Sequence, residues 1–215
     1  MKVLQTTPTG SLSQKHLLSL QDYSKDEICL ILQTAFELKE KNKKGIPHPY
    51  LQGKFLGMIF TKSSTRTRVS FEVGIQQLGG HALFLSSNDI QLGRGETIED
   101  TAKVLSRYLD GIMIRTYKQE DVEALAKYGD IPVINGLTDL LHPCQILADM
   151  MTIYEHKGTL EGLKVAFIGD GNNVANSLLL GCTKLGVHIS VGCPAGYEPD
   201  KKIQELALEN SKTSK

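Results

Sequence analysis

Short apolar runs alternate with segments of helical periodicity along most of the chain, and this alternation limits the fold more than any other feature. The runs that have the length of buried strands are 54–60, 81–85, 111–115, 131–135, 165–168 and 187–191. Between them, apolar residues return about every 3.6 residues, as on one face of a helix. Strands that alternate with helices form parallel sheets covered on both faces. The sequence therefore predicts an α/β protein.

The pattern pauses at Lys157-Gly158-Thr159 and restarts at Leu163. We therefore expect two doubly wound parallel-sheet domains, residues 1–150 and 151–215. A chain of 215 residues is long enough for units with buried cores. Only two strands are predicted in the second domain, which is few for a stable sheet, so we expect that domain to be truncated.

A strand, a polar turn and a helix follow one another between Ile59 and Leu78, and the residues Ser64, Thr65, Arg66 and Thr67 stand at the helix N-terminus. Unpaired backbone N–H groups and the helix dipole make such a terminus an anion site. Hydroxyl donors and a guanidinium fork suit phosphate oxygens, so the turn is predicted to be a phosphate clamp. The alternative is an ordinary N-cap, because Ser and Thr are favoured there in any helix. Arg68 points about 200° away from Arg66 and is predicted to form a structural ion pair.

A second polar stretch, His142-Pro143-Cys144-Gln145, also opens a predicted helix. Proline suits the first helical turn, which places His142 at the cap. His142 and Gln145 are three residues apart and share one face, where imidazole and carboxamide could grip a carbonyl and its amide. Arg115 ends a predicted strand, and ligands of open parallel sheets bind beyond the carboxyl ends of strands. Taken without this convergence, Arg115 could equally be a surface cation.

The turn Gly169-Asp170-Gly171 after a strand invites a dinucleotide-binding interpretation, which the sequence disfavours. The third glycine of that fingerprint is Val174 here, and no acidic residue ends the following strand near Gly192. The amides of Asn172 and Asn173 suit a polar ligand instead. For Asn173 the alternative role is a helix N-cap.

Charge and cysteine content exclude several classes of protein. The 24 basic and 24 acidic residues cancel, so we expect no nucleic-acid partner and no attraction to an anionic membrane. The four cysteines have neither metal-type spacing nor the density of a disulfide framework, and we expect reduced thiols and no metal site. Residues 1–14 lack the apolar core of a secretory signal and no membrane span is predicted, so the expected location is the cytoplasm, or an organellar matrix if a leader has been removed.

With both polar stretches in view, the chain resembles the aspartate/ornithine carbamoyltransferase family. The family pattern Ser-x-Arg-Thr-Arg stands at residues 64–68 and His-Pro-x-Gln at residues 142–145. The similarity continues in residues 91–97, in Arg115 and in residues 169–173, and so covers almost the whole chain. It is strongest to members that use ornithine.

This resemblance implies transfer of a carbamoyl group from carbamoyl phosphate to the side-chain amine of L-ornithine, giving citrulline and phosphate, a step of arginine metabolism that needs no cofactor. Residues 1–150 would be the carbamoyl-phosphate-binding domain and residues 151–215 the first part of the ornithine-binding domain. Catalytic roles would fall to Arg115, His142 and Gln145. Carbamoyl phosphate would bind to Ser64, Thr65, Arg66, Thr67, Gln91, Arg115, His142 and Gln145, and ornithine to Asn173.

The resemblance also implies a homo-oligomer, a trimer or a multiple of trimers, in which Gln91 reaches the site of a neighbouring subunit. The alternative for this loop is a mobile surface segment. Later family motifs that hold the amino acid are absent from these residues, so other readings stay open. The acceptor could be aspartate, putrescine or another amine, or the chain could be a non-catalytic carbamoyl-phosphate-binding module. Cys144 is expected to be a packing residue because this transfer needs no covalent step.

Overall fold

A computed structural model describes residues 10–87, 90–91 and 95–213 of the chain, which is an α/β protein. Its contacts separate two compact units. Unit 1 comprises the described parts of Met1–Gln14, Ser19–Glu37 and Leu140–Lys215, and unit 2 comprises Lys15–Leu18 and Leu38–Asp139. The predicted domain boundary near residue 150 falls inside a helix of unit 1, and that boundary stays a prediction.

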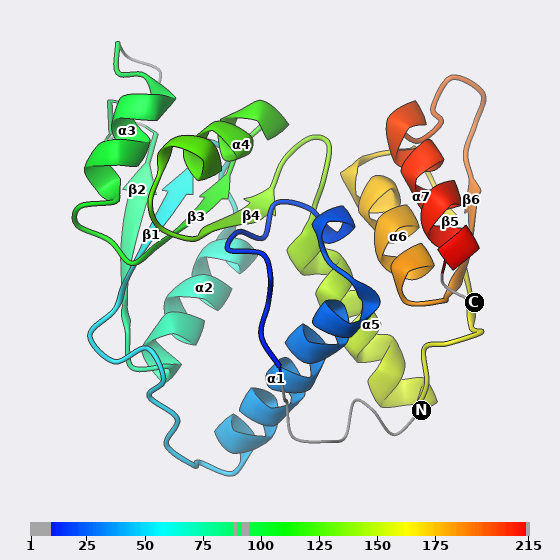
Figure 1. Cartoon of the computed structure of the whole chain (residues 1–215), viewed down its shortest axis with the longest axis horizontal. Coiled ribbons are helices and arrows are strands. Elements are labelled where there is room, and N and C mark those ends of the chain that lie inside the picture. The colour runs from blue at the N-terminus through cyan, green and yellow to red at the C-terminus, as the bar shows by residue number, and fades with distance from the viewer. Residues whose placement is uncertain (1–9, 88–89, 92–94, 214–215) are drawn as a thin grey trace. The chain divides into compact units, whose positions relative to one another are not determined.

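Unit 2 is built on a parallel sheet of four strands in the order β2-β1-β3-β4 (Figure 1). The strands are β1 (Phe55–Phe60), β2 (His81–Ser86), β3 (Gly111–Arg115) and β4 (Val133–Leu137). The first three agree with the sequence prediction to within a residue. The prediction for the fourth was wrong by two residues, because Pro132 has no N–H to donate to the ladder and because the strand continues through an irregularity to Leu137.

Helices cover both faces of this sheet, as expected for a doubly wound domain (Figure 1). They are α2 (Thr65–Gln77), α3 (Ile98–Leu105) and α4 (Gln119–Tyr128). Alternate residues of β3 point to opposite faces. Ile112 and Ile114 pack with Ala102 of α3 and Leu125 of α4, whereas Met113 packs in the cluster that includes Ile75 of α2.

A glycine allows the register shift between β3 and β4. Ile114 pairs with Asn135 and Arg115 pairs with Leu137, so Gly136 is the extra residue. A Cβ atom at Gly136 would lie 2.6 Å from the sulfur of Met113 and 3.1 Å from the carbonyl oxygen of Ile114. Only glycine fits this position without a shift of its neighbours.

The edge of the sheet beyond β4 is covered by a segment that the sequence patterns did not predict. The Leu17 N–H donates to the carbonyl of Val133 over 2.9 Å, and the Asn135 N–H donates back to Leu17 over 2.8 Å. The buried side chain of Asn135 also donates to the Leu18 carbonyl. These bonds satisfy the unpaired backbone groups that an edge strand would otherwise expose.

Unit 1 contains a two-stranded parallel sheet and several helices, of which α6 packs on β6. The sheet pairs β5 (Lys164–Ile168) with β6 (His188–Gly192), as predicted. The helices are α1 (Lys25–Lys43, of which the part up to Glu37 belongs to this unit), α5 (Pro143–Lys157), α6 (Asn173–Lys184) and α7 (Lys201–Thr213). A 3-10 turn η2 (Leu20–Asp22) packs on α6. Gly181 of α6 lets the side chains of Ile146 and Leu20 pack closely against this helix. A Cβ atom at Gly181 would lie only 2.6 Å from the side chain of Ile146.

Residues 10–87, 90–91 and 95–213 include no helix that is both long and apolar enough to span a membrane.

A capping box stands at the start of α1 and gives a test of stability against pH. The carboxylate of Glu27 accepts from the Ser24 N–H at 2.8 Å and from the hydroxyl of Ser13 at 2.6 Å, and the Glu27 N–H donates to the Ser24 hydroxyl. These bonds, chiefly that from Ser13, lower the pKa of Glu27 from 4.5 to about 2. A depressed carboxyl pKa stabilises the fold above pH 4.5, and this contribution is lost as the pH falls toward 2.

We therefore expect Glu27→Gln to unfold at lower temperature than the parent at pH 7, with a difference that narrows between pH 4.5 and pH 3. Thermal unfolding followed by circular dichroism measures both. Glu205→Gln, an exposed change on α7, is the matched control and should behave as the parent at each pH. If the difference in unfolding temperature between Glu27→Gln and the parent stayed constant down to pH 3, the lowered pKa of Glu27 would be wrong.

Candidate functional site

The phosphate clamp predicted at residues 64–67 is a helix N-terminus in the structure. Ser64 is the N-cap of α2, and its hydroxyl accepts from the Thr67 N–H at 3.2 Å and donates to the Thr67 hydroxyl at 3.0 Å. Thr65 and Arg66 are exposed at the first turn. The N-cap interpretation is therefore correct, and it is compatible with the clamp, because the cap leaves the helix dipole and two exposed donors facing outward.

Arg115 joins the clamp from the neighbouring strand. Phe60 and Arg115 are paired at the carboxyl ends of β1 and β3, and the Nη1 of Arg115 donates to the Thr67 hydroxyl at 3.4 Å. Its Nε is buried and has no hydrogen-bond partner among the described residues. Burial lowers the pKa of Arg115, and the nearby guanidinium of Arg66 lowers it further. Two cations that repel each other beside an unused donor form a site suited to an anion.

A cavity of about 530 Å³ opens at this edge of the sheet. Its lining is rich in hydroxyls, contributed by the clamp turn and by the end of β2 at Ser86 and Ser87. Arg68 also lines it, but this guanidinium is paired with Glu72 at 3.1 Å and lies 3.7 Å from the ring centre of Phe84. The predicted ion pair of Arg68 is thus confirmed. Ser86, the last residue of β2, and Ser87, just after it, were not predicted, because no local pattern marks which hydroxyls at a strand end face a cavity.

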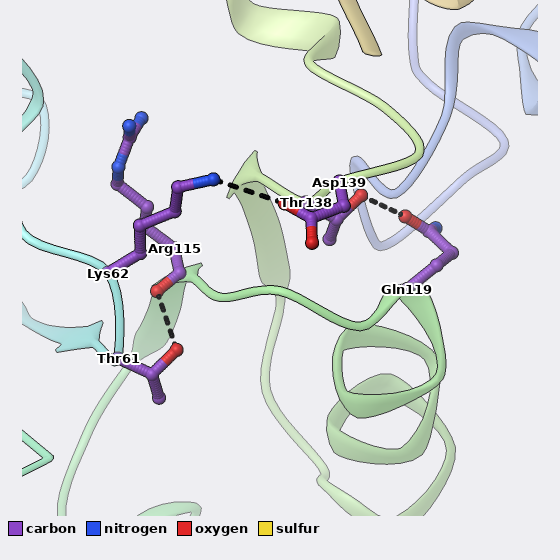
Figure 2. A network of polar contacts seen from close by, with 6 residues as sticks. All are labelled: Thr61, Lys62, Arg115, Gln119, Thr138 and Asp139. Carbon is purple, nitrogen blue, oxygen red and sulfur yellow. Dashed lines mark hydrogen bonds and ion pairs between the residues drawn. The ribbon is translucent and has the colours of Figure 1, made fainter. Parts of the chain in front are cut away.

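Polar contacts tie the clamp turn to the residues after β3 and β4. Figure 2 shows Thr61, Lys62 and Arg115 at the ends of neighbouring strands, with Thr61 donating to the Arg115 carbonyl. Lys62 pairs with Asp139 at 3.1 Å. The buried hydroxyl of Thr138 donates to Gln119 at 2.8 Å (Figure 2). Lys62 and Asp139 were not predicted either, since charged residues in two separate loops give no sequence signal that they will pair.

His142 belongs to unit 1, where it caps α5 as predicted, with Pro143 in the first turn. Its N–H donates to the hydroxyl of Ser177 at 2.7 Å. The adjacent Asn176 donates to the Leu140 carbonyl at 3.1 Å and accepts from the Asp200 N–H at 3.0 Å. Ser177 and Asn176 are buried, so α6 fixes the backbone that presents the His142 imidazole.

Gln145 is the third residue of α5, and its side chain is exposed. Its Nε2 donates to the Oδ1 of Asp149 at 2.8 Å. Cys144, beside it in sequence, has its thiol pKa raised to about 12 by desolvation, so the thiol stays protonated at neutral pH. This agrees with the expectation that Cys144 is not a nucleophile. All four cysteines are free thiols.

The turn after β5 places two asparagines at the start of α6. Asn172 is the N-cap, accepting from the N–H groups of Val174 at 2.9 Å and Ala175 at 3.2 Å. Asn173 is the first helical residue, so the alternative role as an N-cap was wrong for Asn173. Its contact with an amino acid stays a prediction.

Gln91 is exposed and lies in no helix or strand. The next residues of its motif, Leu92, Gly93 and Arg94, are outside the described part of the chain. The structure thus brings together Ser64, Thr65, Arg66, Thr67 and Arg115 in unit 2, while His142, Gln145 and Asn173 stand at helix starts of unit 1. Among the described residues, no three His, Cys, Asp or Glu side chains gather in a way that could hold a metal ion.

Comparison with known proteins tests the family resemblance of the sequence. Residues 15–155 match the family model of the aspartate/ornithine carbamoyltransferase carbamoyl-P binding domain, and residues 161–215 match that of the Asp/Orn binding domain. The ornithine carbamoyltransferase of Caldicellulosiruptor saccharolyticus is 62% identical over 200 residues, which are 93% of this chain and 65% of that protein. That of Anoxybacillus flavithermus is 58% identical over 214 residues, 98% of this chain and 68% of that protein.

A solved structure of ornithine carbamoyltransferase from Pyrococcus furiosus superposes with a TM-score of 0.93 at 58% identity, covering 96% of this chain and 66% of that one. The chain thus spans about two thirds of the length of its relatives. Both family models, the relatives and the shared fold confirm the resemblance seen in the sequence motifs. The chain belongs to the aspartate/ornithine carbamoyltransferase family.

Proposed function

We propose that this chain is an ornithine carbamoyltransferase, which transfers the carbamoyl group of carbamoyl phosphate to the side-chain amine of L-ornithine. The observation that carries the proposal is the pair of guanidiniums, Arg66 and Arg115, at the N-terminus of α2, one of them with a buried unused donor. Relatives with about 60% identity that carry this enzyme name support the choice of acceptor.

Carbamoyl phosphate would bind with its phosphate on the clamp. Backbone N–H groups at the start of α2, the hydroxyls of Ser64, Thr65 and Thr67, and Arg66 would hold the phosphate oxygens. The Ser64 hydroxyl, which donates to Thr67 in this structure, would turn to the ligand. Arg115 would bridge the phosphate and the carbamoyl carbonyl oxygen. In this structure its Nη1 donates to the Thr67 hydroxyl, beside the proposed phosphate position.

The family resemblance gives His142 and Gln145 roles toward the carbamoyl group. His142 would donate to the carbonyl oxygen, and Gln145 would accept from the carbamoyl NH₂. As the amine of ornithine attacks, negative charge grows on the carbonyl oxygen and on the leaving phosphate. Preorganised donors at both places stabilise that charge more than they stabilise the substrate, which lowers the barrier. Asn173 would contact ornithine, and Gln91 would reach the donor site of a neighbouring subunit in a homotrimer.

Citrulline formation tests the function and its pH dependence together. The attacking amine must lose its proton, because an ammonium has no lone pair, so with saturating substrates the initial rate should rise between pH 6 and pH 9. Colorimetric detection of citrulline at several pH values measures this initial rate. The control is lysine offered in place of ornithine, whose amine lies one methylene further out.

A flat profile would contradict rate-limiting attack by this amine. Binding of carbamoyl phosphate without turnover would reduce the chain to a donor-binding module. Absence of donor binding would overturn the proposal altogether.

A further inference from the structure

A carboxylate one turn beyond Gln145 holds its amide group. The Nε2 of Gln145 donates to the Oδ1 of Asp149 at 2.8 Å, and the two residues are four apart on α5. An ionised carboxylate can only accept hydrogen bonds, so it fixes which end of the carboxamide it meets. The NH₂ of Gln145 faces Asp149, and the Oε1 is left without a protein donor among the described residues.

The surroundings of Asp149 distinguish this contact from an ordinary surface pair. Asp149 is half-buried, and no ion pair with a described lysine, arginine or histidine neutralises it. Desolvation raises the pKa of its carboxyl, and the hydrogen bond from Gln145 opposes that rise. On α6, Asp149 lies near Cys182. Burial, together with the charge of Asp149, raises the pKa of this thiol, so it stays protonated and carries no charge. A desolvated carboxylate without a cation is costly, and such groups concentrate at functional sites.

We propose that Asp149 is a positioning residue for the transfer reaction, which holds the carboxamide of Gln145 so that its oxygen faces the NH₂ group of the carbamoyl donor. This inference rests on the proposed function. With the carboxamide reversed, an N–H of Gln145 would face an N–H of the donor, and the same N–H could bind the carbonyl oxygen instead. The donor would then be held in the wrong orientation. Asp149 touches no reacting atom and acts through Gln145 alone.

A pair of probes that differ in one group separates this role from a structural one. Phosphonoacetamide keeps the phosphoryl, carbonyl and NH₂ groups of carbamoyl phosphate and does not hydrolyse at its bridging methylene. Acetonylphosphonate replaces the NH₂ by a methyl group. Calorimetric titration of the full chain with each probe gives two dissociation constants, and their ratio is the preference for the amide. One well-placed neutral hydrogen bond should make this preference about tenfold.

We expect Asp149→Asn to reduce this preference to within about twofold while binding acetonylphosphonate as tightly as the parent does. The asparagine has nearly the same shape but can donate as well as accept, so it no longer selects one orientation of Gln145. Gln145→Ala should lose the preference to the same extent. In that background Asp149→Asn should change nothing more, because the two residues act as one unit. Asp130→Asn, the same change at an exposed position before β4, should leave the preference intact.

The outcomes separate this inference from the function on which it rests. If Asp149→Asn keeps the tenfold preference, the positioning role is wrong and the function stands. If Asp149→Asn weakens both probes equally, the role of Asp149 is structural and the inference is again overturned. If the parent binds neither probe, or does not distinguish them, it is the proposed donor site that fails.

Discussion

Replacing Arg66 with alanine should weaken the binding of carbamoyl phosphate by about 100-fold or more. In the proposed complex this guanidinium makes two charge-assisted hydrogen bonds to the phosphate, each contributing about 1.5 to 3 kcal/mol. Their sum is at least about 3 kcal/mol, which corresponds to two factors of ten in the dissociation constant. Thr67→Ala removes one neutral donor and should cost about tenfold. Isothermal titration with phosphonoacetamide measures these losses without interference from hydrolysis.

Arg68→Ala is the informative control for this prediction. It also removes an arginine side chain from α2, but the guanidinium of Arg68 is already paired with Glu72 and stacked on Phe84. We expect unchanged ligand affinity and a loss in unfolding free energy of about 1 kcal/mol, since both contacts are exposed. Arg68 lines the cavity beside the clamp turn, so an equal loss of affinity in both variants would place the anion nearer to Arg68 and contradict the clamp.

Gly171→Ala should destabilise unit 1 strongly, although it adds only one methyl group. A Cβ at Gly171 would lie 2.1 Å from the nitrogen of Pro199 and 2.3 Å from the carbonyl carbon of Glu198. Both are backbone atoms, so no rotation of a side chain can relieve the overlap. The Gly171 N–H also donates to the Tyr197 carbonyl at 2.7 Å, which keeps the two segments together. We expect a loss of about 3 kcal/mol or more in unfolding free energy, measured by urea denaturation.

Gly74→Ala makes the same change with the opposite expectation. Gly74 lies inside α2 with no heavy atom within 4 Å of an added Cβ. Alanine favours helix by about 0.5 to 1 kcal/mol over glycine, so this variant should be slightly more stable than the parent. If Gly171→Ala proved as stable as Gly74→Ala, the close approach of residues 198–199 to the turn would be wrong.

Local patterns were enough to predict most of the elements and the helix N-terminus at which the clamp is proposed. Ser64 and His142 stand at helix caps because cap preferences depend on only a few neighbouring residues. Arg115 was placed at the strand end by the length of one apolar run. These features need no knowledge of the rest of the chain.

What the sequence did not predict depends on contacts between distant residues. The extra residue Gly136 is set by the sulfur of Met113 on the neighbouring strand, which no local pattern records. The pairing of Lys62 with Asp139 joins loops 77 residues apart. The contact of Gln145 with Asp149 is different, because a carboxamide and a carboxylate four apart on a predicted helix are a local pattern that sequence alone can indicate.

The segment that covers the edge of β4 imposes an order on folding. Leu17 is among the first described residues to leave the ribosome, yet its partners, Val133 and Asn135, are synthesised more than a hundred residues later. Until then the segment has no strand to join, and the loop that its pairing closes carries a large entropic cost. Contacts of such separation slow folding, so the sheet of unit 2 should be completed late, when its earliest and latest segments meet.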